Sequence, residues 1–120
     1  MLKIVDRALG VLLILGAGGH TYGSISSYGR QPLTLLWALS ASLFILLLGA
    51  VHLLRTARRG DRALAWIAVA GTVCQLMASV IFGQLIGAPA DPRVIGFVVI
   101  CSGLIVFGLR DALGAKGATA

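Results

Sequence analysis

The chain has 120 residues, of which 58% are hydrophobic and 12% charged, and its mean hydropathy is +0.98. This composition is too apolar for a soluble domain, which must cover its core with polar surface, and it indicates a membrane environment. The length fits one domain. The net charge of +6 does not indicate nucleic-acid binding, because no recognition motif accompanies the basic residues.

Four apolar runs predict four transmembrane helices, since each approaches or exceeds the roughly 20 residues that cross a bilayer. The expected helices are about 7–28, 33–54, 62–87 and 93–111. Short connections make neighbouring helices antiparallel. The predicted fold is therefore an all-α integral-membrane four-helix bundle, up-down-up-down, forming one domain over residues 1–113 and followed by a flexible tail at 114–120.

The first apolar run turns polar at residues 16–29, GAGGHTYGSISSYG. His20 lies 13 residues after Arg7, about 20 Å along a helix, so we expect it inside the membrane. Gly16, Gly23 and Ser24 share its face at spacings of three and four. Because small residues let helices approach closely, we expect His20 to point into the bundle.

The second run begins after Pro32 and ends near His52 and a group of arginines. We expect His52 to reach interfacial water. It lies too far from His20 for both to hold one haem or metal within a single chain. The arginines that follow recur at helix-like spacing, although Gly60 would interrupt a helix through them, and they are expected to set topology and contact anionic lipids. They are Arg55, Arg58, Arg59 and Arg62.

The third and fourth runs repeat the design of the first two. The tetrapeptide DRAL at 6–9 recurs at 61–64, and the same offset pairs His20 with Gln75 and Ser24 with Ser79. Pro92 opens the fourth run as Pro32 opens the second. We interpret this as two tandem helical hairpins in a parallel repeat. The alternative is chance similarity between low-complexity apolar segments.

Polar residues of all four runs fall at comparable depths and predict one intramembrane layer that contacts a ligand. The proposed ligand-binding residues are His20, Tyr22, Ser24, Ser40, Gln75 and Ser79. Ser42, Cys101 and Ser102 lie at similar depth. The structural alternative is that these groups only hydrogen-bond adjacent helices, at about 0.6 kcal/mol each.

Acidic residues are few, and their positions limit the chemistry. The chain has no glutamate, and we expect all four aspartates, Asp6, Asp61, Asp91 and Asp111, at helix ends. Proton-coupled antiport usually needs an acid within the membrane. No catalytic constellation, metal-ligand set or cofactor motif is recognisable, so the sequence gives little support for an enzyme.

The basic residues predict the orientation. Eight of the ten lie on one side of the predicted bundle and two, Arg30 and Arg93, on the other. The eight are Lys3, Arg7, Arg55, Arg58, Arg59, Arg62, Arg110 and Lys116. This asymmetry predicts cytoplasmic termini in a bacterial-type inner membrane. Lys3 and Arg7 before an apolar run also have the layout of a signal peptide, but we expect a retained helix.

Three functions fit these features. The first is an oligomeric transporter or channel-like protein for a small solute, in which His20 and Gln75 contact the solute. The second is a membrane subunit that binds haem or a quinone through His20. The third is a non-catalytic accessory subunit of a larger membrane complex, packed through its glycine and serine stripes.

Overall fold

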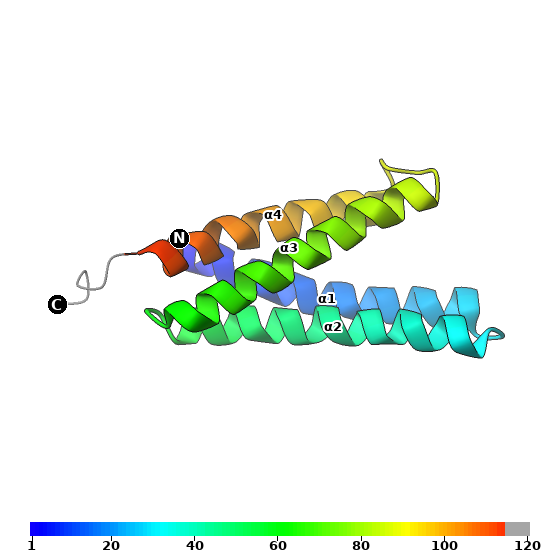
Figure 1. The fold of residues 1–120 in the computed structure, drawn as a ribbon, viewed down its shortest axis with the longest axis horizontal. Helices are drawn as coiled ribbons and strands as arrows, with labels where there is room; N and C mark the ends of the chain where they lie inside the picture. Colours follow the sequence, from blue (N-terminus) through cyan, green and yellow to red (C-terminus); the bar gives the residue numbers. More distant parts are fainter. Residues whose placement is uncertain (115–120) are drawn as a thin grey trace.

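A computed structural model describes residues 1–114 and confirms the all-helical bundle, with no strand in that range. Four helices follow one another: α1 (Leu2–Tyr28), α2 (Pro32–Ala57), α3 (Arg62–Leu85) and α4 (Pro92–Leu113) (Figure 1). The first helix begins at Leu2 rather than near residue 7, and the second continues to Ala57 rather than ending near 54. Apart from Gly114, the predicted tail lies outside the described residues.

The helices begin and end where local chemistry requires it. Pro32 and Pro92 occupy the first turns of α2 and α4, where a missing N–H leaves no hydrogen bond unmade. Asp61 caps α3 by accepting a hydrogen bond from the amide of Leu64 at 3.0 Å. Gly60 precedes this cap with φ of +96°, a conformation that favours glycine, and it lies in the break between α2 and α3, so no single helix runs from Arg55 to Arg62, as predicted.

Three of the four helices, α2, α3 and α4, are long and apolar enough to cross a membrane. Their 26, 24 and 22 residues correspond to about 33 to 39 Å, against about 30 Å of hydrocarbon. The least hydrophobic helix is α1, because it contains Lys3, Asp6, Arg7 and His20. A multi-pass membrane protein fits these helices, and the crossing of α1 stays a prediction.

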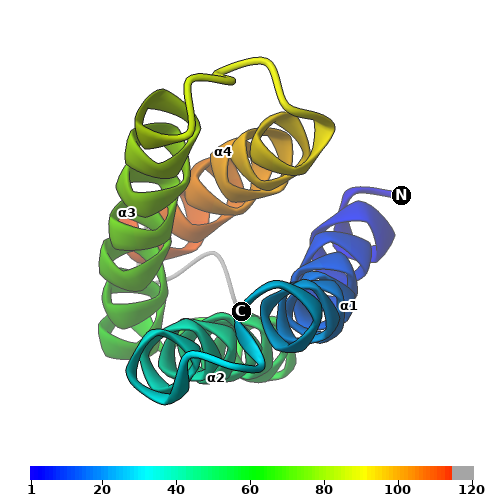
Figure 2. The ribbon, with the colours of Figure 1, turned by 90° about the vertical axis from the view of Figure 1, so that its right-hand side faces the viewer.

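The helices form two antiparallel hairpins, as predicted: α1 packs mainly on α2, and α3 mainly on α4. Residues 1, 58–61 and 114 lie at one end, which we call the charged end, and loops 29–31 and 86–91 lie at the other, the loop end. The hairpins approach each other at the charged end and diverge toward the loop end (Figure 1). Seen from the loop end, the α3–α4 hairpin stands apart from α1–α2 (Figure 2).

Glycine sets the spacing within the first hairpin. A Cβ atom at Gly49 would lie 2.6 Å from Ile14 Cγ1 and 3.1 Å from the carbonyl oxygen of Gly10. The 2.6 Å contact is shorter than real Cβ atoms show, so Ile14 would have to move, and the 3.1 Å contact with a backbone oxygen would push α1 away by a few tenths of an ångström. Glycine at this position therefore allows α1 and α2 to pack at their observed separation.

Glycines also mediate contact between the hairpins. A Cβ at Gly71 would lie 2.8 Å from Leu48, and one at Gly103 would lie 2.7 Å from Leu9. A Cβ at Gly16 would lie 3.1 Å from the ring of Phe97. The expectation of close approach is therefore confirmed at Gly16 but not at Gly23, where a Cβ would meet no atom within 4 Å.

The pattern of burial supports the internal repeat. Buried positions in α1 and α3 recur at the 55-residue offset that separates the two DRAL segments. The pairs are Gly10 and Ala65, Leu13 and Ala68, Ala17 and Thr72, and Ser24 and Ser79. The two copies of the repeat differ at their aspartates: Asp6 is buried, whereas Asp61 is exposed and caps α3.

Candidate functional site

A buried arginine organises the charged end of the bundle. Arg55, in the last turn of α2, is 1% exposed. Its Nη2 lies 2.5 Å from Asp6 Oδ1 of α1, and its Nη1 donates to Asp111 Oδ2 of α4. The expectation that Arg55 faces lipid headgroups is wrong, because its planar guanidinium forks between two carboxylates inside the bundle.

A second arginine covers this pair from the loop between α2 and α3. The Nη2 and Nη1 atoms of Arg59 lie 3.5 Å from Asp6 Oδ2 and Asp111 Oδ1, and its side chain is 37% exposed. We call Asp6, Arg55, Arg59 and Asp111 the charge cluster. Two formal positive and two formal negative charges balance within it, which buried ions require.

Asp6 is the most enclosed acid of the charge cluster. It is 1% exposed, and its Oδ2 forms no hydrogen bond within residues 1–114. The prediction that all aspartates lie at helix ends is wrong for Asp6, because α1 begins at Leu2 and its second turn faces the other helices. Asp6 is thus an acid buried inside the bundle, near the charged end.

His52 extends the network inward from Arg55. It is 0% exposed, and its Nε2 lies 2.6 Å from Thr72 Oγ1 of α3. Thr72 donates its own proton to the carbonyl oxygen of Ala68 at 2.6 Å, so it accepts from His52 Nε2–H. His52 Nδ1 then accepts from Arg55 Nε at 3.4 Å. The expectation that His52 reaches interfacial water is wrong, because α3 covers it.

These residues join the two hairpins at one end. Among the described residues, the side-chain hydrogen bonds between hairpins are Arg55 to Asp111 and His52 to Thr72. The ion pair of Arg59 with Asp111 also crosses between them. Polar attachment of one hairpin to the other is therefore confined to the charged half of the molecule.

The residues of the predicted intramembrane layer form separate clusters instead. His20 Nδ1 lies 2.7 Å from Ser42 Oγ of α2, and Ser24 Oγ donates to the carbonyl oxygen of His20 at 2.7 Å. In the other hairpin, Gln75 Nε2 donates to Ser79 Oγ at 3.2 Å. No hydrogen bond in residues 1–114 joins His20 to Gln75. Each hairpin thus carries its own polar cluster at matching positions of the repeat.

The other four members of the layer take no part in these clusters. Tyr22 is 77% exposed. Ser40 is exposed, and its hydroxyl donates to the carbonyl oxygen of Leu36 on its own helix at 2.9 Å. Ser102 is exposed, whereas Cys101 is buried. The structure therefore does not gather the six proposed ligand-binding residues around one point.

The sequence contains a signal for the burial of His52 and Arg55 that our predictions missed. Ile45, Leu48 and Gly49 form the buried face of α2, and the same helical spacing of three and four continues to His52 and Arg55. Two polar residues that continue the buried apolar face of a helix are expected to be buried too, and to have polar partners on neighbouring helices. No sequence pattern identifies which acids are those partners.

The loop end carries a different, exposed ion pair. Arg93 Nη2 lies 2.8 Å from Asp91 Oδ2. The side-chain and backbone hydrogen bonds from Arg93 lower the pKa of Asp91 to about 2. Both residues belong to the start of α4, so this ion pair does not join one helix to another. It therefore cannot hold the hairpins together as the charge cluster does.

Residues 1–114 contain no group of three or more His, Cys, Asp or Glu side chains that could hold a metal ion. The chain matches no protein-family model, and comparison with curated proteins and with solved structures finds no significant similarity. The function must therefore be inferred from the geometry alone.

Proposed function

We propose that this protein is a channel-like transporter for a small solute, with the two hairpins as its two halves. The observation that carries the proposal is the buried charge cluster, which joins the hairpins at one end while they diverge at the other (Figures 1 and 2). In this proposal the charge cluster closes the path at the charged end, and the solute enters from the loop end.

Physical chemistry supports a gating role for the charge cluster. Ionisable groups buried within a membrane bundle are costly and commonly mark transport paths. In this proposal the two hairpins move relative to each other. The ion pair between Arg55 and Asp111 can then open, because Arg55 keeps Asp6 as a partner when Asp111 moves away. Arg59, at 3.5 Å from both acids, is already positioned to follow either one.

The polar cluster within each hairpin supplies groups that a solute can meet. His20 is half-buried, so its ring is accessible beside Ser42. Gln75 and Ser79 occupy the matching place in the other hairpin. The proposal takes these groups as solute contacts that a change in hairpin angle brings together.

Orientation and assembly complete the proposal. We place the charged end in the cytoplasm of a bacterial-type membrane, because the basic residues gather there. Arg58 and Arg62 are exposed at that end and suit contact with anionic lipids. We also infer that the chain works as an oligomer, because one pair of hairpins encloses little volume.

Flux through proteoliposomes tests the proposal with one conservative substitution. Asp111→Asn removes the charge that holds the hairpins together but keeps an acceptor for Arg55. Glycerol and urea entry is followed by light scattering, and K⁺ and H⁺ flux by fluorescent dyes. We expect wild-type flux of at least one probe above protein-free liposomes, increased about five- to tenfold by the substitution.

Asp91→Asn is the matched control, since it makes the same change in the exposed pair at the loop end and should leave flux unchanged. A second variant, His20→Ala, should abolish flux while the helical circular dichroism is retained. The proposal is refuted by flux no greater than in empty liposomes for all four probes. It is also refuted if both asparagine variants act alike.

A further inference from the structure

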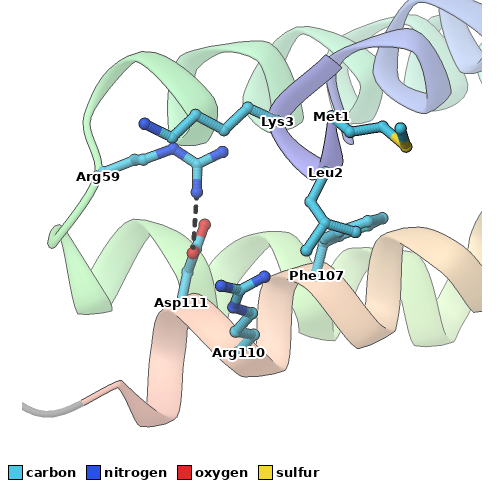
Figure 3. A pocket seen from close by; sticks show the side chains of 7 residues that line it. All are labelled: Met1, Leu2, Lys3, Arg59, Phe107, Arg110 and Asp111. Carbon is cyan, nitrogen blue, oxygen red and sulfur yellow. Dashed lines mark ion pairs between the residues drawn. The ribbon is translucent and has the colours of Figure 1, made fainter. Parts of the chain in front are cut away.

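The structure contains a cavity at the charged end, beside the charge cluster. Its volume is about 350 Å³, and its walls come from the start of α1, the α2–α3 loop and the last turns of α4. Lys3, Arg59 and Arg110 line it together with Asp111. We call it the terminal cavity (Figure 3).

The terminal cavity carries an excess of positive charge. Three cationic side chains face it against one carboxylate, and that carboxylate already binds Arg55 and Arg59. Lys3 and Arg110 form no ion pair within residues 1–114. Within residues 1–114 this local excess of positive charge is therefore not neutralised by an acid, and it attracts an anion.

Arg59 keeps its hydrogen-bonding capacity available to a ligand. Its contacts with Asp6 and Asp111 are 3.5 Å long, which is ion pairing without a hydrogen bond. A guanidinium has five N–H donors in a fixed fork that matches the oxygens of a phosphate. The donors of Arg59 are thus free to bind such a group beside Lys3 and Arg110.

Apolar side chains also line the terminal cavity. They are Met1, Leu2 and Phe107, and Figure 3 shows Leu2 and Phe107 away from Arg59. A site that combines cationic and apolar side chains suits a molecule that has both a charged group and a hydrocarbon part.

We propose that the terminal cavity binds the phosphate group of an anionic phosphate ester, held by Lys3, Arg59 and Arg110. Such a group is present in the headgroup of an anionic phospholipid and in a free organic phosphate. Arg59 belongs to both the terminal cavity and the charge cluster, whereas Lys3 and Arg110 line only the cavity, so variants of these two residues test phosphate binding separately from solute transport.

Binding to purified full-length protein in an uncharged detergent tests the site. One arm measures retention of phosphatidylglycerol against phosphatidylcholine by native mass spectrometry. The other measures binding of glycerol 3-phosphate by calorimetry. The test variant is Lys3→Gln with Arg110→Gln, and the control is Arg7→Gln with Arg30→Gln. Both remove two exposed cations and so lower the net charge equally, but Arg7 and Arg30 do not line the cavity.

We expect the test variant to weaken binding about tenfold or more and the control to change it by less than about threefold. Retention of phosphatidylglycerol alone identifies a lipid headgroup as the ligand. Binding of glycerol 3-phosphate with the same dependence on the variants identifies a free phosphate ester. Equal losses in both variants, or no binding of either probe by wild-type protein, overturn the proposal. Circular dichroism verifies that each variant is folded.

Discussion

Substitution of Arg55 by methionine gives the sharpest test of how the charged end is held together. Methionine keeps much of the length of the side chain but removes its charge and its donors. Asp6 and Asp111 then remain buried without their main partner, and His52 Nδ1 loses its donor. We expect Arg55→Met to destabilise the folded protein strongly.

The expected loss of folding stability can be worked out from the burial of Arg55. Removing one member of a buried ion pair costs about 3 to 5 kcal/mol, because an uncompensated charge stays in the interior. Arg55 is 1% exposed, so its pairs with Asp6 and Asp111 belong to this class rather than to surface pairs. Arg59 already reaches both acids at 3.5 Å and can move closer, which places the expected loss near 3 kcal/mol.

Unfolding in mixed micelles of dodecyl maltoside and sodium dodecyl sulfate, followed by far-ultraviolet circular dichroism, measures the loss. The triple variant Asp6→Asn, Arg55→Met, Asp111→Asn is the decisive comparison. It removes the stranded charges, so it should recover about half or more of the stability lost in the single variant. A single-variant loss below about 1 kcal/mol, or a triple variant less stable than the single, would refute the reasoning.

Three further predictions concern other parts of the molecule. Gly49→Ala should destabilise the first hairpin by about 1 to 3 kcal/mol in the same unfolding assay, because its Cβ would meet atoms of α1. Gly19→Ala, with no atom within 4 Å of the new Cβ, should be neutral or stabilising. Thr72→Val should cost about 1 to 3 kcal/mol, because it leaves the buried Nε2–H of His52 without an acceptor; a neutral effect would contradict that network. The lowered pKa of Asp91 means that its ion pair stabilises the fold above the ordinary pKa of 3.8, and that this stability is lost as the pH falls toward 2. Titration of its carboxyl carbon by NMR should give a midpoint near 2, and a midpoint near 3.8 would show that the pair does not form.

Much of the fold could be predicted because its signals are local. Apolar runs of about 20 residues, Pro32 and Pro92 at helix starts, and Gly60 at a break each report a property of a few neighbouring residues. The tandem hairpins could be predicted from the repeated DRAL segment. The start of α1 could not, because Lys3 and Asp6 precede the apolar run and their side chains say nothing about what packs on them.

The candidate site could not be predicted because it depends on contacts between distant parts of the chain. Asp6 and Asp111 come from opposite ends of the sequence, and only the packing of α1 and α4 around α2 brings both to Arg55. Similar depth in the membrane does not establish contact either. His20 and Gln75 match in the repeat, yet each bonds within its own hairpin.

The order in which the chain is synthesised has a consequence for the charge cluster. Asp6, Arg55 and Arg59 all leave the ribosome with the first hairpin, in which one carboxylate faces two guanidinium groups. The second carboxylate, Asp111, follows Arg55 by 56 positions and emerges with the last helix. A nascent or truncated chain without α4 therefore has one more positive than negative charge among these residues, and insertion of the final helix balances it.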